Sequence, residues 1–266
     1  MTISPELFAY LRVICQNASD AILQVYHAAN VESITKADCS PLTAADLAAH
    51  RIILDGLKVL TPTIPIISEE DANISSPLRA SWERFWLVDP LDGTKEFLSR
   101  NGEFTVNIAL IEGHAPRLGI VHVPITGLTY WGGSGLGAYR ALHATDPGHS
   151  INVRQSLFTP PKVLGSRSHR ERSLDNFLLN LGNYQFLSIG SALKFCVLAE
   201  GLADVYPRLS PTSEWDTAAG QAVLEGAGGA VLRLDGQPLQ YNCTDHYLNP
   251  HFIAVSGAQG QFFKYL

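Results

Sequence analysis

The stretch "WLVDPLDGTKEF" at residues 86–97 restricts the possible folds of this chain more than any other feature. The apolar run Phe85–Val88 predicts a buried strand, and the chain places a carboxylate, Asp89, directly at the end of that strand. Pro90 fixes its own φ and lacks an N–H, and Asp92 follows two residues later, so the sequence predicts a type I turn. Because burial of an unpaired charge is costly, the fold must supply either solvent or a cation at this strand end.

Further oxygen atoms are predicted to lie near the two Asp side chains. The carbonyl of Leu91 can point toward the same place, and Glu69 lies at the end of a short predicted strand, 64–70. Asp216 opens a helix in "SEWDTAAG", and carboxylates at strand ends and helix starts of an α/β protein tend to face one crevice. An all-oxygen set suits a hard cation such as Mg²⁺, whereas the Cys and His ligands that zinc favours are missing from these motifs.

Each of these acids also has an ordinary structural explanation. Asp89–Gly93 fits a type I turn. Asp216 completes a capping box that Ser213 begins, and Asp46 completes another with Thr43. Taken singly, such residues are more commonly caps and turns than ligands. Together they are harder to explain in this way, because a strand of aromatic and aliphatic residues delivers the first carboxylate.

The residues after the two acids are suited to phosphate. Gly93 lets a backbone N–H approach a ligand closely, and Thr94 begins a segment whose N–H groups can bind phosphate. A bare carboxylate cluster would repel phosphate, but the same cluster with two or three Mg²⁺ ions bound would attract it. Metal-assisted hydrolysis of a phosphate ester therefore explains both halves of the motif.

Composition places the chain among soluble globular proteins. Its 266 residues permit one large domain or two smaller ones, with 46% hydrophobic and 17% charged residues. The net charge of −6 argues against a nucleic-acid polymer as the main partner, because binding to that backbone needs a basic face. Four widely spaced cysteines without a C-x-x-C are typical of reduced packing residues in a cytosolic protein. The first 20 residues do not resemble a signal peptide and no stretch reaches the length of a membrane span, so we expect a cytoplasmic protein.

The chain divides near residue 150. Before it, the pattern predicts an amphipathic helix from Leu7 to Val25, a helix over 43–60 and then several strands. The Gly-rich segment 132–137 lacks the Lys-Ser/Thr of a P-loop, and we interpret it as a hairpin loop. Residues 143–161 are polar and Pro-containing, and strands and helices alternate after them. We therefore expect an α+β metal- and phosphate-binding domain, 1–150, and an α/β substrate-binding domain, 151–266.

These motifs resemble the Mg²⁺-dependent, lithium-sensitive phosphatases of the inositol monophosphatase superfamily. The resemblance covers nearly the whole chain and includes both signatures, the D-P-x-D-G-T motif and the W-D-x-A-A-G helix start. Within the superfamily, the chain is most similar to the bacterial 3′(2′),5′-bisphosphate nucleotidases. The stretches that support this branch are "SPLTAADLAAH" (40–50), "DGTKEFLSRNGEFTVNIALI" (92–111), "SRSH" (166–169) and "GSALKFCVLAEGLADVYPR" (190–208).

The resemblance implies a fold, a reaction and roles for individual residues. The fold would be a layered α-β-α-β-α sandwich of the sugar-phosphatase type, often dimeric. Gly93 and Thr94 would contact the scissile phosphate, and Asp46 and Thr94 would orient and deprotonate the attacking water. The implied Mg²⁺ ligands are Glu69, Asp89, the Leu91 carbonyl, Asp92 and Asp216, and all of them except Asp89 would also contact the substrate.

The implied substrate is adenosine 3′,5′-bisphosphate, which would be cut to AMP and phosphate in sulfur metabolism. The phosphate that stays needs cationic or N–H donors, and Arg208 stands near the place where inositol monophosphatases have a substrate-binding glutamate, in a loop of different length. Arg208 fits a solvated loop cation equally well. The other candidate contacts are Arg167, Ser168, His169, Gly190, Ser191 and Lys194.

Two other functions remain open at this point. One is an inositol or sugar-phosphate phosphatase that uses the same metals. The other is a non-catalytic sensor, which the presence of both Asp46 and Thr94 disfavours. Some members of the superfamily lie on the inner membrane face, but no basic amphipathic stretch of this chain favours such a location.

Overall fold

The structure is a computed structural model that describes residues 3–28, 33–35, 41–143, 145–167, 172–257 and 260–266. Within these ranges the helices are α1 (Pro5–Tyr26), α2 (Ala44–Leu60), α3 (Ser76–Ala80), α4 (Thr94–Leu98), α5 (Arg172–Leu181), α6 (Leu193–Ala199), α7 (Glu214–Gly226) and the 3₁₀ turn η1 (Phe263–Tyr265). The strands of the first half are β1 (Ser33–Thr35), β2 (Pro41–Thr43), β3 (Ile66–Ser68), β4 (Arg84–Asp92), β5 (Thr105–Glu112), β6 (Ala115–His122), β7 (Thr129–Gly133), β8 (Gly137–Ala141) and β9 (His149–Ile151). Those of the second half are β10 (Lys162–Ser166), β11 (Gln185–Ile189), β12 (Val205–Arg208), β13 (Ala230–Arg233) and β14 (Phe252–Val255).

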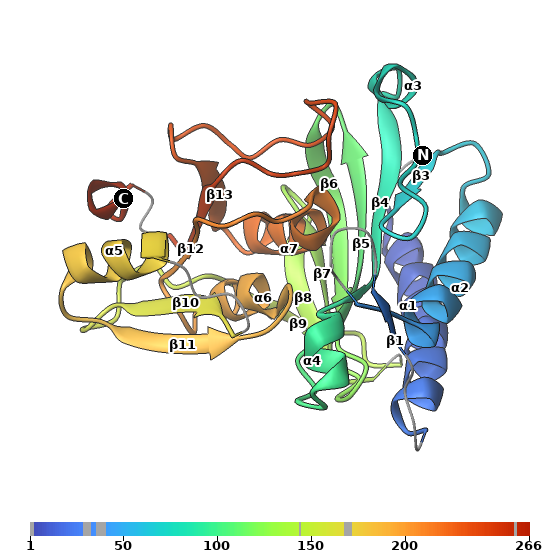
Figure 1. The fold of residues 1–266 in the computed structure, drawn as a ribbon, viewed down its shortest axis with the longest axis horizontal. Helices are drawn as coiled ribbons and strands as arrows, with labels where there is room; N and C mark the ends of the chain where they lie inside the picture. The colour runs from blue at the N-terminus through green and yellow to red at the C-terminus, as the bar shows by residue number, and fades with distance from the viewer. Residues whose placement is uncertain (1–2, 29–32, 36–40, 144, 168–171, 258–259) are drawn as a thin grey trace.

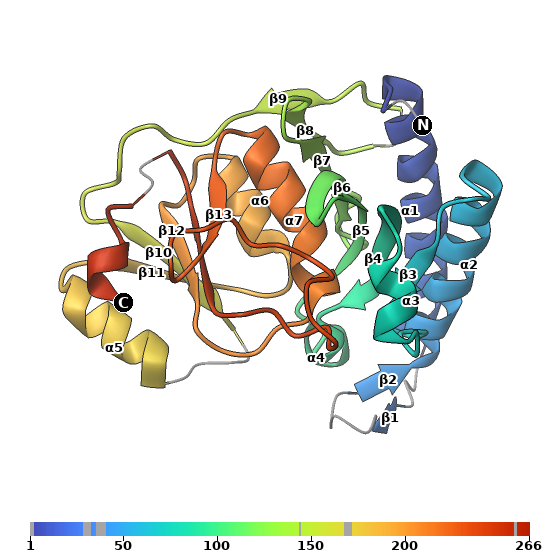
Figure 2. The same ribbon diagram turned by 90° about the horizontal axis from the view of Figure 1, so that it is seen from above.

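Two sheets alternate with layers of helices (Figure 1). The larger sheet has the order β3-β4-β5-β6-β7-β8-β9, and the smaller has the order β11-β10-β12-β14-β13. Helices α1 and α2 cover one face of the larger sheet, α6 and α7 lie between the sheets, and α5 lies on the far side of the smaller sheet (Figures 1 and 2). The predicted α-β-α-β-α sandwich is confirmed.

Strand β4 shows why the central strands are almost continuously apolar. Its odd-numbered residues Phe85 and Leu87 join a core cluster that contains residues of α6 and α7. Its even-numbered residues Trp86 and Val88 join a second cluster that contains residues of α1 and α2. Because both faces of the sheet are covered, successive side chains are all buried.

The predicted type I turn after Val88 is wrong. Residues Asp89 to Asp92 continue β4, where Asp89 pairs with Asn107 and Asp92 pairs with Thr105. The three-residue step on β4 faces a two-residue step on β5, so β4 carries a bulge at this point. Pro90, which cannot donate to a ladder, is accommodated by this bulge. A turn would have reversed the chain, whereas the bulge keeps both carboxylates at one edge of the sheet.

Most predicted elements agree with the structure to within a few residues. The hairpin loop between β7 and β8 and the capping box that begins α2 are both confirmed. Five short elements, β2, α3, α4, β9 and η1, were not predicted as strands or helices, because segments of three to five residues carry too little periodicity.

The larger sheet ends with β9 and the smaller begins with β10, so the chain changes sheets close to the predicted boundary. One core cluster nevertheless contains residues of both sheets, such as Val121 and Tyr206. The division into two domains stays a prediction.

Two further sequence expectations concern the cysteines and the membrane. Cys15, Cys196 and Cys243 are free thiols in the structure, and Cys39 lies outside the described residues. None of the described helices combines the length and the apolar character that a bilayer crossing requires.

Candidate metal and phosphate site

A cavity of about 410 Å³ opens where β3 and β4 end and where α4 and α7 begin. Strands β3 and β4 are parallel, so their carboxyl ends meet at one edge of the larger sheet. The cavity is lined by Pro41, Glu69, Asp89, Leu91, Asp92, Gly93, Thr94, Lys95, Glu96, Ser166, Ser191, Lys194, Phe195, Tyr206, Arg208, Thr212, Ser213, Trp215, Asp216 and Thr217. The predicted common crevice is therefore present, and it contains Glu69 and the three aspartates.

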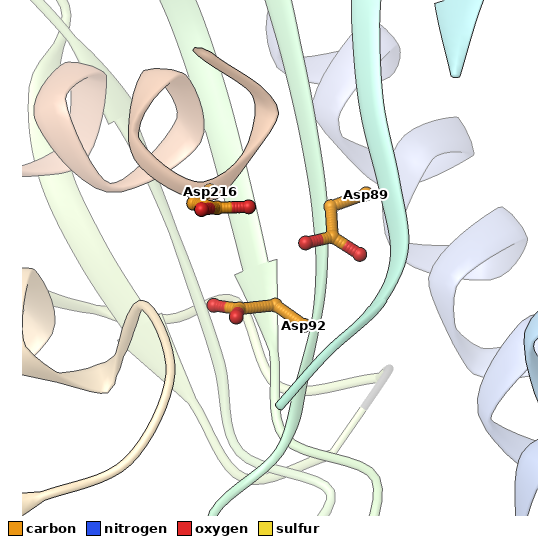
Figure 3. A group of neighbouring side chains, drawn as sticks. All are labelled: Asp89, Asp92 and Asp216. Atoms are coloured by element: carbon orange, nitrogen blue, oxygen red, sulfur yellow. The ribbon is translucent and has the colours of Figure 1, made fainter. Parts of the chain in front are cut away.

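Three carboxylates converge in this cavity. Asp89 and Asp92 come from β4 and Asp216 from the first turn of α7, and their side chains point into a shared space (Figure 3). One oxygen of each lies within 4.8 Å of one oxygen of each of the others. No Cys or His belongs to this group, so the donor set is entirely oxygen. A hard divalent cation fits such a set.

Electrostatics favour a cation at the same point. Burial raises the pKa of Asp89 well above its usual value, and repulsion from Glu69, Asp92, Asp216 and Asp46 raises it further. Burial likewise raises the pKa of Asp216, with repulsion from Asp92 and Glu69 added. The cluster is unfavourable as a set of bare anions, and a bound cation would relieve that cost.

Backbone N–H groups fix the orientation of each carboxylate. The N–H of Leu91 donates to Asp89 Oδ1 at 3.0 Å, and the N–H of Ser213 donates to Asp216 Oδ2 at 2.9 Å. The N–H of Ala192 donates to Asp92 Oδ2 at 2.7 Å across 100 residues of sequence. These contacts fix the positions of the three carboxylates, because each side chain is held by an atom of the main chain.

Asp46 performs two functions with two different oxygens. Its Oδ2 accepts hydrogen bonds from the N–H and the hydroxyl of Thr43, at 2.7 and 2.6 Å, and so caps α2. Its Oδ1 faces the hydroxyl of Thr94 at 3.3 Å. The Thr94 hydroxyl also lies 3.5 Å from the carbonyl oxygen of Leu91. The predicted pair is thus in contact, beside the carboxylate cluster.

Two cations, Lys194 and Arg208, also line the cavity. The Lys194 ammonium donates to the carbonyl oxygens of Ser191 and Ile189 at 2.5 and 3.3 Å, and burial lowers the pKa of Lys194 to about 8 against the opposing effect of Asp92. Within the described part of the chain, Ser191 Oγ and Arg208 Nε are buried without a hydrogen-bond partner. Buried polar atoms of this kind need a partner, and both residues line the cavity.

Some predicted substrate contacts lie elsewhere or cannot be placed. Gly190 is not among the residues that line the cavity, and its N–H donates to Glu103. Arg167 is paired with Glu103. Ser168 and His169 lie outside the described residues.

Sequence reasoning missed several residues of this site. Asn107 on β5 donates to Asp92 Oδ2 at 3.3 Å, and nothing in the sequence marks it except that it is a polar residue between the apolar Val106 and Ile108. Tyr206 and Trp215 supply aromatic walls. Trp215 stands directly before Asp216, so its place in the motif was a signal that could have been used.

Comparison with known proteins agrees with this geometry. Residues 6–260 match the model of the inositol monophosphatase family. A 3′(2′),5′-bisphosphate nucleotidase CysQ of Escherichia coli O157:H7 is 50% identical over 243 residues, which cover 90% of this chain and 96% of the relative. The CysQ of Salmonella typhimurium is 50% identical over 246 residues, covering 91% and 98%.

Solved structures show the same relation. The crystal structure of CysQ from Bacteroides thetaiotaomicron superposes with a TM-score of 0.83 at 36% identity, covering 95% of this chain and 97% of that one. An IMPase from Thermotoga maritima superposes with a TM-score of 0.78 at 23% identity, covering 98% and 96%, which shows a shared fold.

Proposed function

This chain belongs to the inositol monophosphatase family, and we propose that it is a metal-dependent 3′(2′),5′-bisphosphate nucleotidase. The reaction adds water to adenosine 3′,5′-bisphosphate and releases AMP and inorganic phosphate. The observation that carries the proposal is the convergence of Asp89, Asp92 and Asp216 in a cavity that Lys194 and Arg208 also line. Relatives named for this activity, half identical over nine-tenths of the chain, support it.

The acidic cluster would hold the metal. We assign Mg²⁺, two or three ions per site, to Glu69, Asp89, the Leu91 carbonyl, Asp92 and Asp216, because all five offer oxygen and all five line the cavity. When bound, Mg²⁺ supplies Lewis-acid stabilisation of the charge on the phosphate and a lower pKa for water. The protein contributes the fixed positions of the ligands.

Thr94 and Asp46 would accept the proton that the attacking water loses. The Thr94 hydroxyl donates to Asp46 Oδ1, so its own oxygen lone pairs are directed away from Asp46 and can accept a hydrogen bond from the attacking water. The capping contacts keep the Asp46 carboxylate in place to take a proton through Thr94. Gly93 and Thr94 would contact the scissile phosphate, because both line the cavity beside Asp92.

The phosphate that is retained would lie against Ser191, Lys194 and Arg208. These residues carry the unpartnered hydroxyl, the ammonium and the unpartnered guanidinium Nε of the cavity wall. Arginine recognises phosphate through several donors at once, whereas a sugar hydroxyl would not require it. Ser168, His169 and Gly190 stay candidate contacts of the same ligand.

Phosphate release tests the proposal directly. Purified protein is assayed with adenosine 3′,5′-bisphosphate, inositol 1-phosphate and fructose 1,6-bisphosphate, each with and without Mg²⁺ and with added Li⁺. The proposal requires the bisphosphate nucleotide to have the highest kcat/KM, no turnover without Mg²⁺ and inhibition by Li⁺. A clear preference for inositol 1-phosphate would instead favour the alternative, an inositol or sugar-phosphate phosphatase with the same metal site.

A cytoplasmic location and a homodimer also belong to this proposal, and peripheral contact with the inner membrane face is the alternative location. Size-exclusion chromatography with light scattering tests the dimer, and cell fractionation tests the location. Neither outcome affects the catalytic assignment.

A further inference from the structure

The segment between β11 and α6 is held at two points, by the last residue of β4 and by a residue of the segment before β5. The N–H of Ala192 donates to Asp92 Oδ2 at 2.7 Å, and the N–H of Gly190 donates to Glu103 Oε2, also at 2.7 Å. Ser191 lies between these two contacts and lines the cavity. One contact involves a carboxylate of the acidic cluster, whereas the other involves Glu103, which does not line the cavity and has no role in the proposed chemistry.

Glu103 makes more than this one contact. Its two carboxylate oxygens accept from Arg167, Oε2 from Nε at 2.8 Å and Oε1 from Nη2 at 2.7 Å. Arg167 Nη2 also donates to the carbonyl of Ser188 at 2.8 Å. Burial raises the pKa of Glu103, but Arg167 and the N–H of Gly190 outweigh that effect and lower it, so the group is a carboxylate at neutral pH. The pair therefore connects β10, the end of β11 and the segment before β5.

Gly190 is shaped for this contact. A Cβ at this position would lie 2.7 Å from the carbonyl oxygen of Glu103 and 2.9 Å from Glu103 Cβ, closer than real Cβ atoms approach. Only glycine lets the two segments come together at this distance. The close approach therefore depends on both residues. Gly190 has no side chain that would clash, and Glu103 provides the carboxylate that accepts its N–H.

Ser191 has a conformation that needs such support. Its φ is +47°, in the left-handed region that residues with a Cβ adopt only when their surroundings hold them there. In this conformation its carbonyl accepts from Lys194 at 2.5 Å, and its hydroxyl is buried without a partner. The positions of a hydroxyl and an ammonium in the cavity wall therefore depend on how the backbone is held at residues 190 and 192.

We propose that Glu103 is a positioning residue that sets the preference for substrates with a second phosphate, because it holds Gly190 and thereby fixes Ser191 and Lys194 in the cavity wall. The inference rests on the proposed function, in which these two side chains contact the retained phosphate. Glu103 itself touches neither the substrate nor the metal. Its effect is therefore expected in discrimination between substrates and not in the chemical step.

Two substrates separate these effects. Adenosine 3′,5′-bisphosphate carries the retained phosphate, whereas adenosine 3′-monophosphate lacks it and presents the same scissile ester. For Glu103→Ala we expect kcat/KM on the bisphosphate to fall about tenfold or more, mainly through KM, since a charge-assisted hydrogen bond to the loop is lost. On the monophosphate we expect a change below about threefold. Glu103→Gln keeps an acceptor for the N–H of Gly190 and should recover most of the preference.

Glu112→Ala is the matched control. Glu112 accepts a hydrogen bond from Arg84, and its Oε2 lies 3.2 Å from Arg117 Nε. Like Glu103, it is a partly buried acid that pairs with arginine, and it lies on β5, the strand that Glu103 precedes. It stands at the other end of β5, roughly 23 Å of strand away from Thr105, which pairs with Asp92. This variant should leave the ratio of the two substrates unchanged. Thermal unfolding of all variants shows that each is folded.

The outcomes distinguish the inference from the function on which it rests. If Glu103→Ala lowers kcat/KM on both substrates equally, or if Glu103→Gln is as defective as Glu103→Ala, the positioning role is wrong while the proposed function stands. If the wild-type enzyme does not prefer the bisphosphate over the monophosphate, the proposed function is wrong, and the positioning role that rests on it is wrong as well.

Discussion

Replacing Asp89 by asparagine should make the metal-free protein more stable and abolish most of its response to Mg²⁺. The side chain is 1% exposed and faces Glu69, Asp92, Asp216 and Asp46. Asparagine has nearly the same shape, and its oxygen can still accept the N–H of Leu91, which now donates to Asp89 Oδ1. The substitution therefore removes one negative charge without removing the local hydrogen bond.

The magnitude follows from the spacing of the carboxylates. Two unit charges 4.8 Å apart repel by about 3.5 kcal/mol at an effective dielectric constant of about 20. Proton uptake by the cluster relieves part of this repulsion in the metal-free wild type, so we expect a gain of about 1–3 kcal/mol. For a chain of this size, each kcal/mol corresponds to roughly 2–4 °C, and Tm should rise by about 2–12 °C.

Bound Mg²⁺ should stabilise the wild type more than it stabilises Asp89→Asn. At a concentration of about 100 times Kd, binding to the folded state alone stabilises the wild type by about 2.7 kcal/mol, or roughly 5–10 °C in Tm. Asp89→Asn should show less than half of that shift, because one ligand and one charge are missing.

Differential scanning calorimetry in EDTA and in a Mg²⁺ titration measures both effects. The control is Asp55→Asn, which removes the same charge from an exposed residue of α2 that does not line the cavity, and it should follow the wild type. The reasoning is refuted if Asp89→Asn melts below the wild type in EDTA, or if Mg²⁺ stabilises both proteins equally.

Three other predictions concern separate residues. Asp46→Asn should lower kcat about 100-fold or more with little change in Tm, because the amide oxygen can still cap α2 while its NH₂ cannot accept from Thr94; steady-state kinetics near wild-type values would contradict the proton role. His122 is buried with its pKa lowered to about 4 by burial, so the unfolded chain binds a proton below about pH 6.5 that the folded protein does not. Stability should therefore fall by up to about 3 kcal/mol as pH drops from 6.5 to 4, and urea unfolding of His122→Gln should show a flatter dependence over this range; parallel curves would rule out His122 as the cause. Arg208→Gln should lower kcat/KM on adenosine 3′,5′-bisphosphate about tenfold or more and leave the 3′-monophosphate nearly unchanged; an equal loss on both substrates would remove Arg208 from the retained-phosphate contact.

The identity of the candidate ligands could be predicted from the sequence because each acid stands at a recognisable boundary. Glu69 follows β3, Asp89 follows the apolar run of β4, and Asp216 lies in the first turn of α7. Boundaries of this kind depend on neighbouring residues, through apolar periodicity and capping. The same local information misled at Pro90, where the residues of a type I turn are accommodated by a bulge in β4, since the choice between them depends on β5.

Contacts between distant segments could not be predicted in this way. Asp92 accepts from Ala192 across 100 residues, and Glu103 pairs with Arg167 across 64. Such contacts depend on how the two sheets pack around α6 and α7, and no local pattern encodes that packing. Arg167 illustrates the consequence, because its sequence context suggested a phosphate contact and its partner in the structure is Glu103.

The sequence by itself determined which chemistry this chain can perform, because the acids, the threonine and the cations are fixed by residue type and by their places at the ends of elements. Only the tertiary structure decided which partner each of those groups contacts. It gives one oxygen of Asp46 to the cap of α2 and the other to Thr94, and it brings Glu103 against Gly190 beside the cavity. The physical reason is that a residue's functional groups come from its own atoms, whereas the partner of each oxygen is set by the packing of segments far apart in the chain.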